Sequence, residues 1–178
     1  KTAYEIVMWL EFRRVLFRSK QFILDKTRDL AEKEQQNAFT YNMAYYQFST
    51  GDYRGAMKLL QQVEFTDLYY QLDMRSVLLK CYFETGDEDA LGYHLSAFRI
   101  FLLRHKEVSE YQRIIYKNLI KFTGMLSRYA YNRKKLEELQ QQIEDKKQVA
   151  DINWIRKKVS EAIAEIGRAH VWTPVTSR

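Results

Sequence analysis

Cysteine, proline and glycine are scarce in this chain of 178 residues, which contains one, one and six of them. The single thiol, Cys81, cannot form an internal disulfide and excludes a metal site built from several cysteines. We expect Cys81 to be a small apolar residue on a buried helix face, and it is compatible with a reducing, cytoplasmic setting. No run approaches the roughly 20 apolar residues that span a bilayer. The shortage of glycine and proline favours helix throughout.

The two ends of the chain resemble a sequence of different origin from the rest. Residues 1–19 and 166–178 resemble the translated index-side adapter of short-read DNA libraries, read in opposite orientations. Both matches require TGA to be read as tryptophan, at Trp9 and Trp172. A basic amphipathic membrane helix is the alternative for the N-terminal stretch. We expect both ends to be non-native and the natural N-terminus to be missing.

Removing these ends changes the charge balance. They carry six basic residues and, with Glu165, three acidic ones, so the net charge falls from +6 to +3. The remaining charge is uneven, because residues 20–103 carry −3 and residues 104–164 carry +6. A basic second half can mark an acidic partner, although exposed helices are often simply solvated.

A Gly-Asp pair occurs twice, at Gly51-Asp52 and at Gly86-Asp87, 35 residues apart. Each pair follows an aromatic-rich segment with helical spacing and precedes a second amphipathic segment. Glycine can end a helix in a left-handed conformation that costs other residues energy. Aspartate can cap the free amides of the following helix. The pattern predicts two helix-turn-helix units.

These residues resemble the tetratricopeptide repeat, a helix-turn-helix unit of about 34 residues. Ala44 matches the small residue of the family's first helix, and Gly51, Asp52 and Ala56 match its turn and second helix. The resemblance covers about residues 40–105 and implies an all-α fold of antiparallel helical hairpins, an α-solenoid fragment. We therefore expect tetratricopeptide-like hairpins over residues 20–105.

A further helical hairpin and a C-terminal helix are predicted over residues 106–165. We expect Ser109 to cap a long helix, and a turn near Tyr131-Asn132 precedes the basic start of the next one. We expect Asp151 to cap the last helix. Gly124 lies inside the periodic pattern and is not read as a repeat turn.

Motifs for catalysis are lacking in the sequence. It contains no glycine-rich phosphate loop, no paired histidines with metal-ligand spacing and no serine elbow. His94 and His105 are isolated, and the acidic group Asp87 to Asp89 suits the positive end of a helix better than a metal. We expect no enzyme activity, no cofactor and no metal.

Aromatic residues suggest a binding surface instead. In tetratricopeptide proteins the first helix of each hairpin faces a groove that receives peptides, which implies a protein or peptide partner here. Counting back from the Gly-Asp turns gives the matching positions: Tyr41, Tyr45, Phe48, Ser76, Lys80 and Phe83. Packing between helices is the alternative role for these side chains. The family's carboxylate clamp requires lysine and asparagine in the groove, and Tyr41, Tyr45 and Ser76 depart from it.

Two other functions fit the sequence. The first is binding of RNA or DNA by the basic second half, through stacking and phosphate contacts. Its candidate residues are Tyr116, Lys117, Lys121, Arg128, Arg133, Lys134 and Lys135. The second is a regulatory arm of a larger enzyme or sensor.

Overall fold

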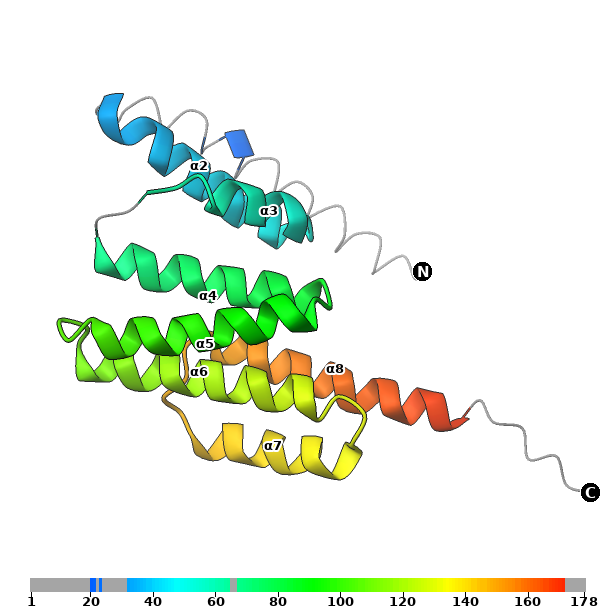
Figure 1. Cartoon of the computed structure of the whole chain (residues 1–178). Helices are drawn as coiled ribbons and strands as arrows, with labels where there is room; N and C mark the ends of the chain where they lie inside the picture. The colour runs from blue at the N-terminus through cyan, green and yellow to red at the C-terminus, as the bar shows by residue number, and fades with distance from the viewer. Residues whose placement is uncertain (1–19, 22, 24–31, 65–66, 172–178) are drawn as a thin grey trace, which may run out of the picture. The chain divides into compact units, whose positions relative to one another are not determined.

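A computed structural model describes residues 20–21, 23, 32–64 and 67–171 (Figure 1). These residues form seven helices and no strand, which confirms the all-helical fold class for this part of the chain. The helices are α2 (Glu32–Ser49), α3 (Tyr53–Leu60), α4 (Leu68–Glu84), α5 (Glu88–Arg104), α6 (Glu110–Arg128), α7 (Arg133–Asp145) and α8 (Ile152–Val171). The N-terminal stretch 1–19 lies outside the described residues. Among the described helices, none has the length and apolar character that crossing a membrane requires.

The chain divides into two compact units, Lys1–Asp87 and Glu88–Arg178. In the first unit, α2 packs against α3, α3 against α4, and α2 also contacts α4. In the second unit, α5 packs against α6, and α6, α7 and α8 contact one another. Short turns reverse the chain between α2 and α3 and between α6 and α7, so each of these pairs is an antiparallel hairpin (Figure 1).

Both Gly-Asp pairs lie at helix ends, as predicted. Gly51 and Gly86 have φ values of +86° and +69°, in the left-handed region that favours glycine. Asp52 then caps α3, because its carboxylate accepts a hydrogen bond from the Gly55 amide at 2.9 Å. Residues within a few positions of the turn therefore determine where α3 begins.

Two further predicted helix starts are confirmed in the second unit. Ser109 caps α6 by accepting a hydrogen bond from the Gln112 amide, and Asn132 caps α7 by accepting one from the Lys135 amide. Gly124 lies inside α6, as its place in the apolar pattern indicated. Asp151 immediately precedes α8 and has a φ of +50°.

The core of the first unit is built on small side chains where its helices meet. Ala44 of α2 and Ala56 of α3 are fully buried, together with Leu60, Val77 and Cys81. Alanine at both positions lets the two helix backbones approach closely. Larger half-buried side chains pack around this cluster: Tyr41, Tyr45, Phe48, Tyr53, Met57, Leu59, Met74 and Leu78.

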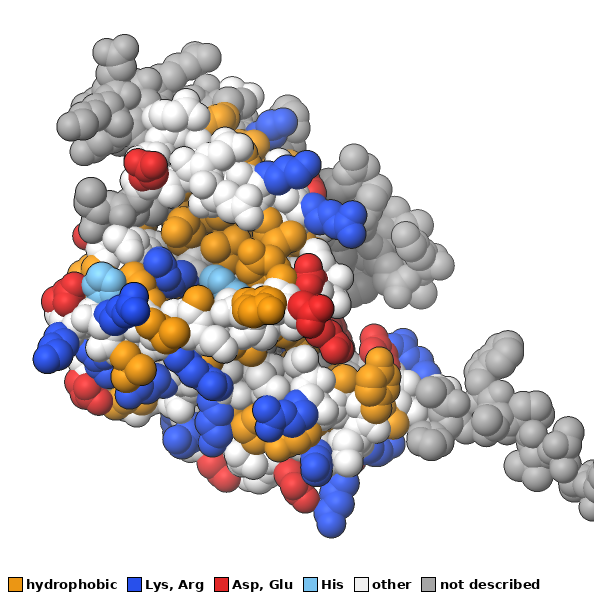
Figure 2. All heavy atoms as spheres, viewed as in Figure 1, with side chains coloured by type: hydrophobic (Ala, Val, Ile, Leu, Met, Phe, Trp, Pro, Cys, Tyr) orange, Lys and Arg blue, Asp and Glu red, His pale blue; other side chains and the backbone are white. Residues whose placement is uncertain are grey.

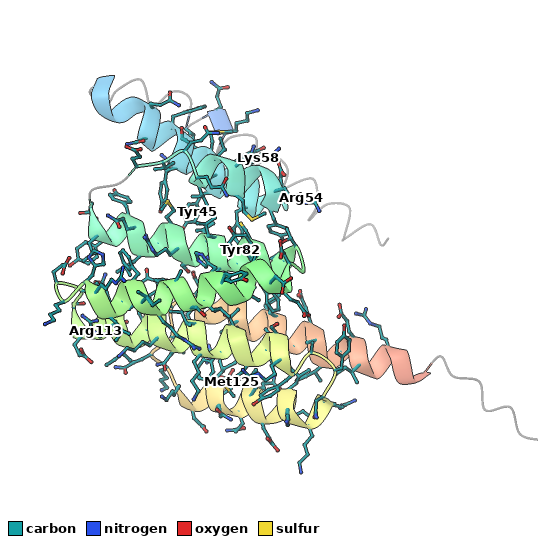
Figure 3. All side chains as sticks on the ribbon, in the orientation of Figure 1. Tyr45, Arg54, Lys58, Tyr82, Arg113 and Met125 are labelled. Carbon is teal, nitrogen blue, oxygen red and sulfur yellow. The ribbon has the colours of Figure 1, made fainter. Side chains whose placement is uncertain are left out.

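Two polar side chains fix the loops of the second unit. Arg113 of α6 lies beside the α5–α6 connection (Figure 3) and donates to the carbonyl oxygens of Leu102, His105 and Val108. The buried amide of Asn118 donates to the Gln148 carbonyl oxygen at 2.7 Å, which ties the α7–α8 connection to α6. Each bond satisfies a backbone acceptor that the last turn of α5 or a loop would otherwise leave to water.

Candidate partner-binding surface

Tyr41 and Tyr45 lie one turn apart on α2 and face α4, where both meet Asp73. The Tyr45 hydroxyl donates to Asp73 Oδ2 at 2.8 Å, and the Tyr41 hydroxyl donates to the same oxygen. The two rings stand edge to face, with centroids 5.3 Å apart. Figure 3 shows Tyr45 between α2 and α4. The pair is thus held in place by a charged acceptor on the neighbouring helix.

The environment of Tyr41 shifts its ionisation. Burial raises the pKa of the Tyr41 phenol well above its ordinary value of 10.0, and the hydrogen bond to the Asp73 carboxylate raises it further. The phenol therefore stays protonated and remains a donor over the physiological pH range.

Two exposed tyrosines extend this group along α4. Asp67 caps α4 through the amides of Tyr69 and Tyr70, and the two side chains are 57 % and 51 % exposed. The Tyr70 ring meets the Tyr41 ring edge to face, with centroids 5.7 Å apart. We call Tyr41, Tyr45, Tyr70 and Asp73 the tyrosine cluster. The cluster joins three half-buried side chains to the exposed ring of Tyr70.

Phe48 and Lys80 meet at the other end of the α2–α4 contact. The Lys80 ammonium lies 5.1 Å from the centroid of the Phe48 ring, within range of a cation–π interaction. Phe48 also packs against Tyr53 of α3, with centroids 5.6 Å apart. Lys80 is only 4 % exposed, so its charge lies inside the protein rather than at the surface.

The remaining predicted groove positions are Ser76 and Phe83 of α4. Ser76 has no exposed area, and Phe83 is half-buried. The structure therefore brings Tyr41, Tyr45, Phe48 and Lys80 together across the α2–α4 contact. Ser76 and Lys80 are buried, so neither side chain offers an exposed surface to a partner.

Tyr70 and Asp73 were not among the predicted groove positions. A signal for them exists in the sequence, because the helical face through Lys80 and Ser76 reaches Asp73 one turn earlier. Tyr70 lies on the same face, three residues before Asp73. The hydrogen bonds themselves join residues 28 and 32 positions apart, and no local pattern predicts them.

The basic residues of the second unit divide into paired and unpaired groups. Arg133 is paired with Glu137 at 2.8 Å, and the Lys135 ammonium lies 5.0 Å from the centroid of the Tyr129 ring. Four others are exposed and have no acidic partner among the described residues: Lys117, Lys121, Arg128 and Lys134. The Lys121 ammonium lies 5.5 Å from the centroid of the Phe122 ring. Tyr116, the predicted stacking residue, is half-buried against Phe98, with centroids 5.6 Å apart.

Groups that could carry catalysis or hold a metal are few in the described residues. In this part of the chain no three His, Cys, Asp or Glu side chains are grouped so as to hold a metal ion. His105 packs on Phe101 and contacts Glu107 at 2.8 Å, while His94 lies beside Phe98. Burial raises the pKa of the Cys81 thiol to about 12, which makes it a poor nucleophile.

The chain was compared with known proteins. No protein-family model, no curated protein and no solved structure matches it.

Proposed function

We propose that the chain is a non-catalytic scaffold whose first unit binds a protein or peptide at the tyrosine cluster. The proposal includes a tetratricopeptide-like repeat, which the two Gly-Asp turns and the α2–α3 hairpin support. The observation that carries it is the contact between α2 and α4. There, Asp73 holds the half-buried Tyr41 and Tyr45, and the Tyr41 ring meets the exposed ring of Tyr70. Tyrosine suits binding because it buries a large area with little loss of rotamer freedom.

The charge of the cluster favours a partner segment that carries arginine or lysine. The Asp73 carboxylate is the charged group of the cluster, and it accepts hydrogen bonds from the hydroxyls of Tyr41 and Tyr45. A cation near these rings would gain both charge attraction and a cation–π interaction. The exposed Asp67 at the start of α4 adds negative charge at the same end of the helix.

The test uses a displayed library of short random peptides, selected on the full chain. A selected peptide is then labelled, and its affinity is measured by fluorescence anisotropy. Tyr70→Ala should weaken binding by about 30-fold, because loss of an aromatic hot spot costs about 2 kcal/mol. Asp73→Asn should weaken binding of peptides that contain arginine or lysine.

The matched control is Tyr93→Ala, which removes a tyrosine that is 80 % exposed on α5. This change should leave peptide affinity unaltered. If no peptide is selected, or if Tyr70→Ala and Tyr93→Ala have equal effects, the tyrosine cluster is not the binding site.

A further inference from the structure

A row of cations follows one face of α6. Lys117, Lys121 and Arg128 are all exposed, and their spacing of four and seven residues places them on the same side of the helix. At a rise of 1.5 Å per residue, the row spans about 16 Å. Figure 2 shows Lys and Arg side chains over α6 and α7.

These cations are not neutralised by neighbouring carboxylates. Elsewhere in the second unit, acidic partners hold Arg133, Arg156 and Lys158 at 2.6–2.8 Å. Within residues 32–64 and 67–171, no ion pair forms at Lys117, Lys121, Arg128 or Lys134. Four charges of one sign on one hairpin, none of them with an acidic partner in the described part of the chain, produce a positive potential at this surface.

An exposed aromatic ring lies at the end of the row. Tyr131 is in the turn between α6 and α7 and is 96 % exposed, the highest value among the exposed large hydrophobic side chains of the described residues. Arg128 precedes it by three residues and Lys134 follows it by three. Asn132 caps α7 at the next position, so the turn that presents Tyr131 is fixed by a hydrogen bond. The ring is free of packing and is flanked by cations.

We propose that the row on α6 and the α6–α7 turn bind single-stranded nucleic acid. Lys117, Lys121, Arg128 and Lys134 contact the phosphates, and Tyr131 stacks on a base. A free ring needs an unstacked base as its partner, which single strands offer and duplexes do not. A membrane surface fits less well, because an interfacial helix needs an apolar face beside its cations and this row has none.

The proposal concerns the second unit and does not depend on peptide binding by the first. It also assigns stacking to Tyr131 rather than to Tyr116, whose ring is already packed against Phe98. The two tyrosines therefore give opposite expectations. Tyr131→Ala should reduce binding without loss of helix content, whereas Tyr116→Ala should reduce helix stability.

The experiment measures fluorescence anisotropy of labelled oligo(U) and oligo(dT) of about 12 nucleotides, a length within the usual site size. The full chain is titrated at several salt concentrations. Tyr131→Ala should weaken binding about tenfold, since one stacked base contributes 1–3 kcal/mol, and Tyr131→Phe should retain it. Lys117→Gln with Lys121→Gln should lower the slope of log affinity against log salt by about 1.4, because each phosphate contact contributes about 0.7.

The control is Lys157→Gln, which removes an exposed cation on α8 that lies 3.8 Å from Glu161. It should leave both affinity and salt slope close to those of the unmodified chain. Three results would overturn the proposal: no binding of either oligonucleotide at low salt, no effect of Tyr131→Ala, or equal effects of all lysine changes. Equal or tighter binding to a polyglutamate peptide or to phosphatidylserine vesicles would assign the surface to another anionic partner.

Discussion

The contact of Asp73 with two tyrosines gives the sharpest test of how the first unit is held together. Asp73→Ala removes the acceptor of both the Tyr41 and the Tyr45 hydroxyl. A hydrogen bond to a charged group contributes about 1.5–3 kcal/mol. Because all three side chains are half-buried, the freed hydroxyls can turn toward water, and we expect a total loss of about 2 kcal/mol. Asp73→Asn keeps one oxygen acceptor and should lose about half as much.

The assay is urea unfolding followed by circular dichroism. With a denaturant slope of about 2 kcal/mol/M, the Asp73→Ala midpoint should fall by about 1 M. A double-mutant cycle with Tyr45→Phe isolates one hydrogen bond and should give a coupling of about 1 kcal/mol. Glu64→Gln serves as the control, because it removes an exposed carboxylate that lies before α4.

One result would refute this reasoning. If Asp73→Ala and Glu64→Gln shift the midpoint equally, the two tyrosine hydroxyls contribute nothing to the contact between α2 and α4. A coupling energy near zero in the cycle would lead to the same conclusion. The tyrosine rings would then pack by apolar contact alone.

Three other predictions concern local chemistry. Gly51→Ala should destabilise the fold by about 1 kcal/mol, because Gly51 has a φ of +86°, which is unfavourable for alanine. Gly92→Ala should stabilise the fold by up to about 1 kcal/mol, because the added methyl group would meet no neighbouring atom and alanine favours helix. Thermal unfolding measures both changes. Cys81 should react with iodoacetamide at pH 8 far more slowly in the folded chain than in denaturing urea, since a pKa of about 12 lowers the thiolate fraction about a thousandfold. The raised pKa of Tyr41 means that its contribution is complete below pH about 10 and is lost as pH rises further. Tyr41→Phe should therefore flatten the fall in stability above that pH, and equal slopes for both chains would contradict this.

Features that depend on a few neighbouring residues could be predicted from the sequence. These features are Gly51 after the end of α2, Asp52 as the cap of α3, Ser109 as the cap of α6 and the turn at Asn132 before α7. All of them act within four residues along the chain. Helical periodicity likewise predicted the length of α6 through Gly124, because glycine inside a helix costs only about 1 kcal/mol. Local chemistry of this kind determines where helices begin and end.

Features that depend on which helices meet could not be predicted in the same way. Ser76 and Lys80 share a helical face with Asp73, yet Ser76 and Lys80 are buried while Asp73 meets two tyrosines. Periodicity identifies a face but does not say whether a partner or another helix covers it. The same limit applies to Tyr116 and Tyr131. Only the second lies in a turn, where its neighbour Asn132 could have indicated exposure.

The C-terminal end of α8 allows a test of whether a helix can be extended without adding to the core of the second unit. α8 continues past Ala164 to Val171, through the start of the adapter-like stretch. Each residue added to an existing helix gains one backbone hydrogen bond, and no proline interrupts residues 165–171. The helix can therefore continue into the adapter-like stretch even if that stretch has a different origin from the rest of the chain. Between Ser160 and Arg168 no side chain is buried, and Ile166 is only half-buried. Removing residues 166–178 should therefore shift Tm by only a few degrees, about 1 kcal/mol. A larger loss in calorimetry would show that Ile166 covers apolar surface on which the second unit depends.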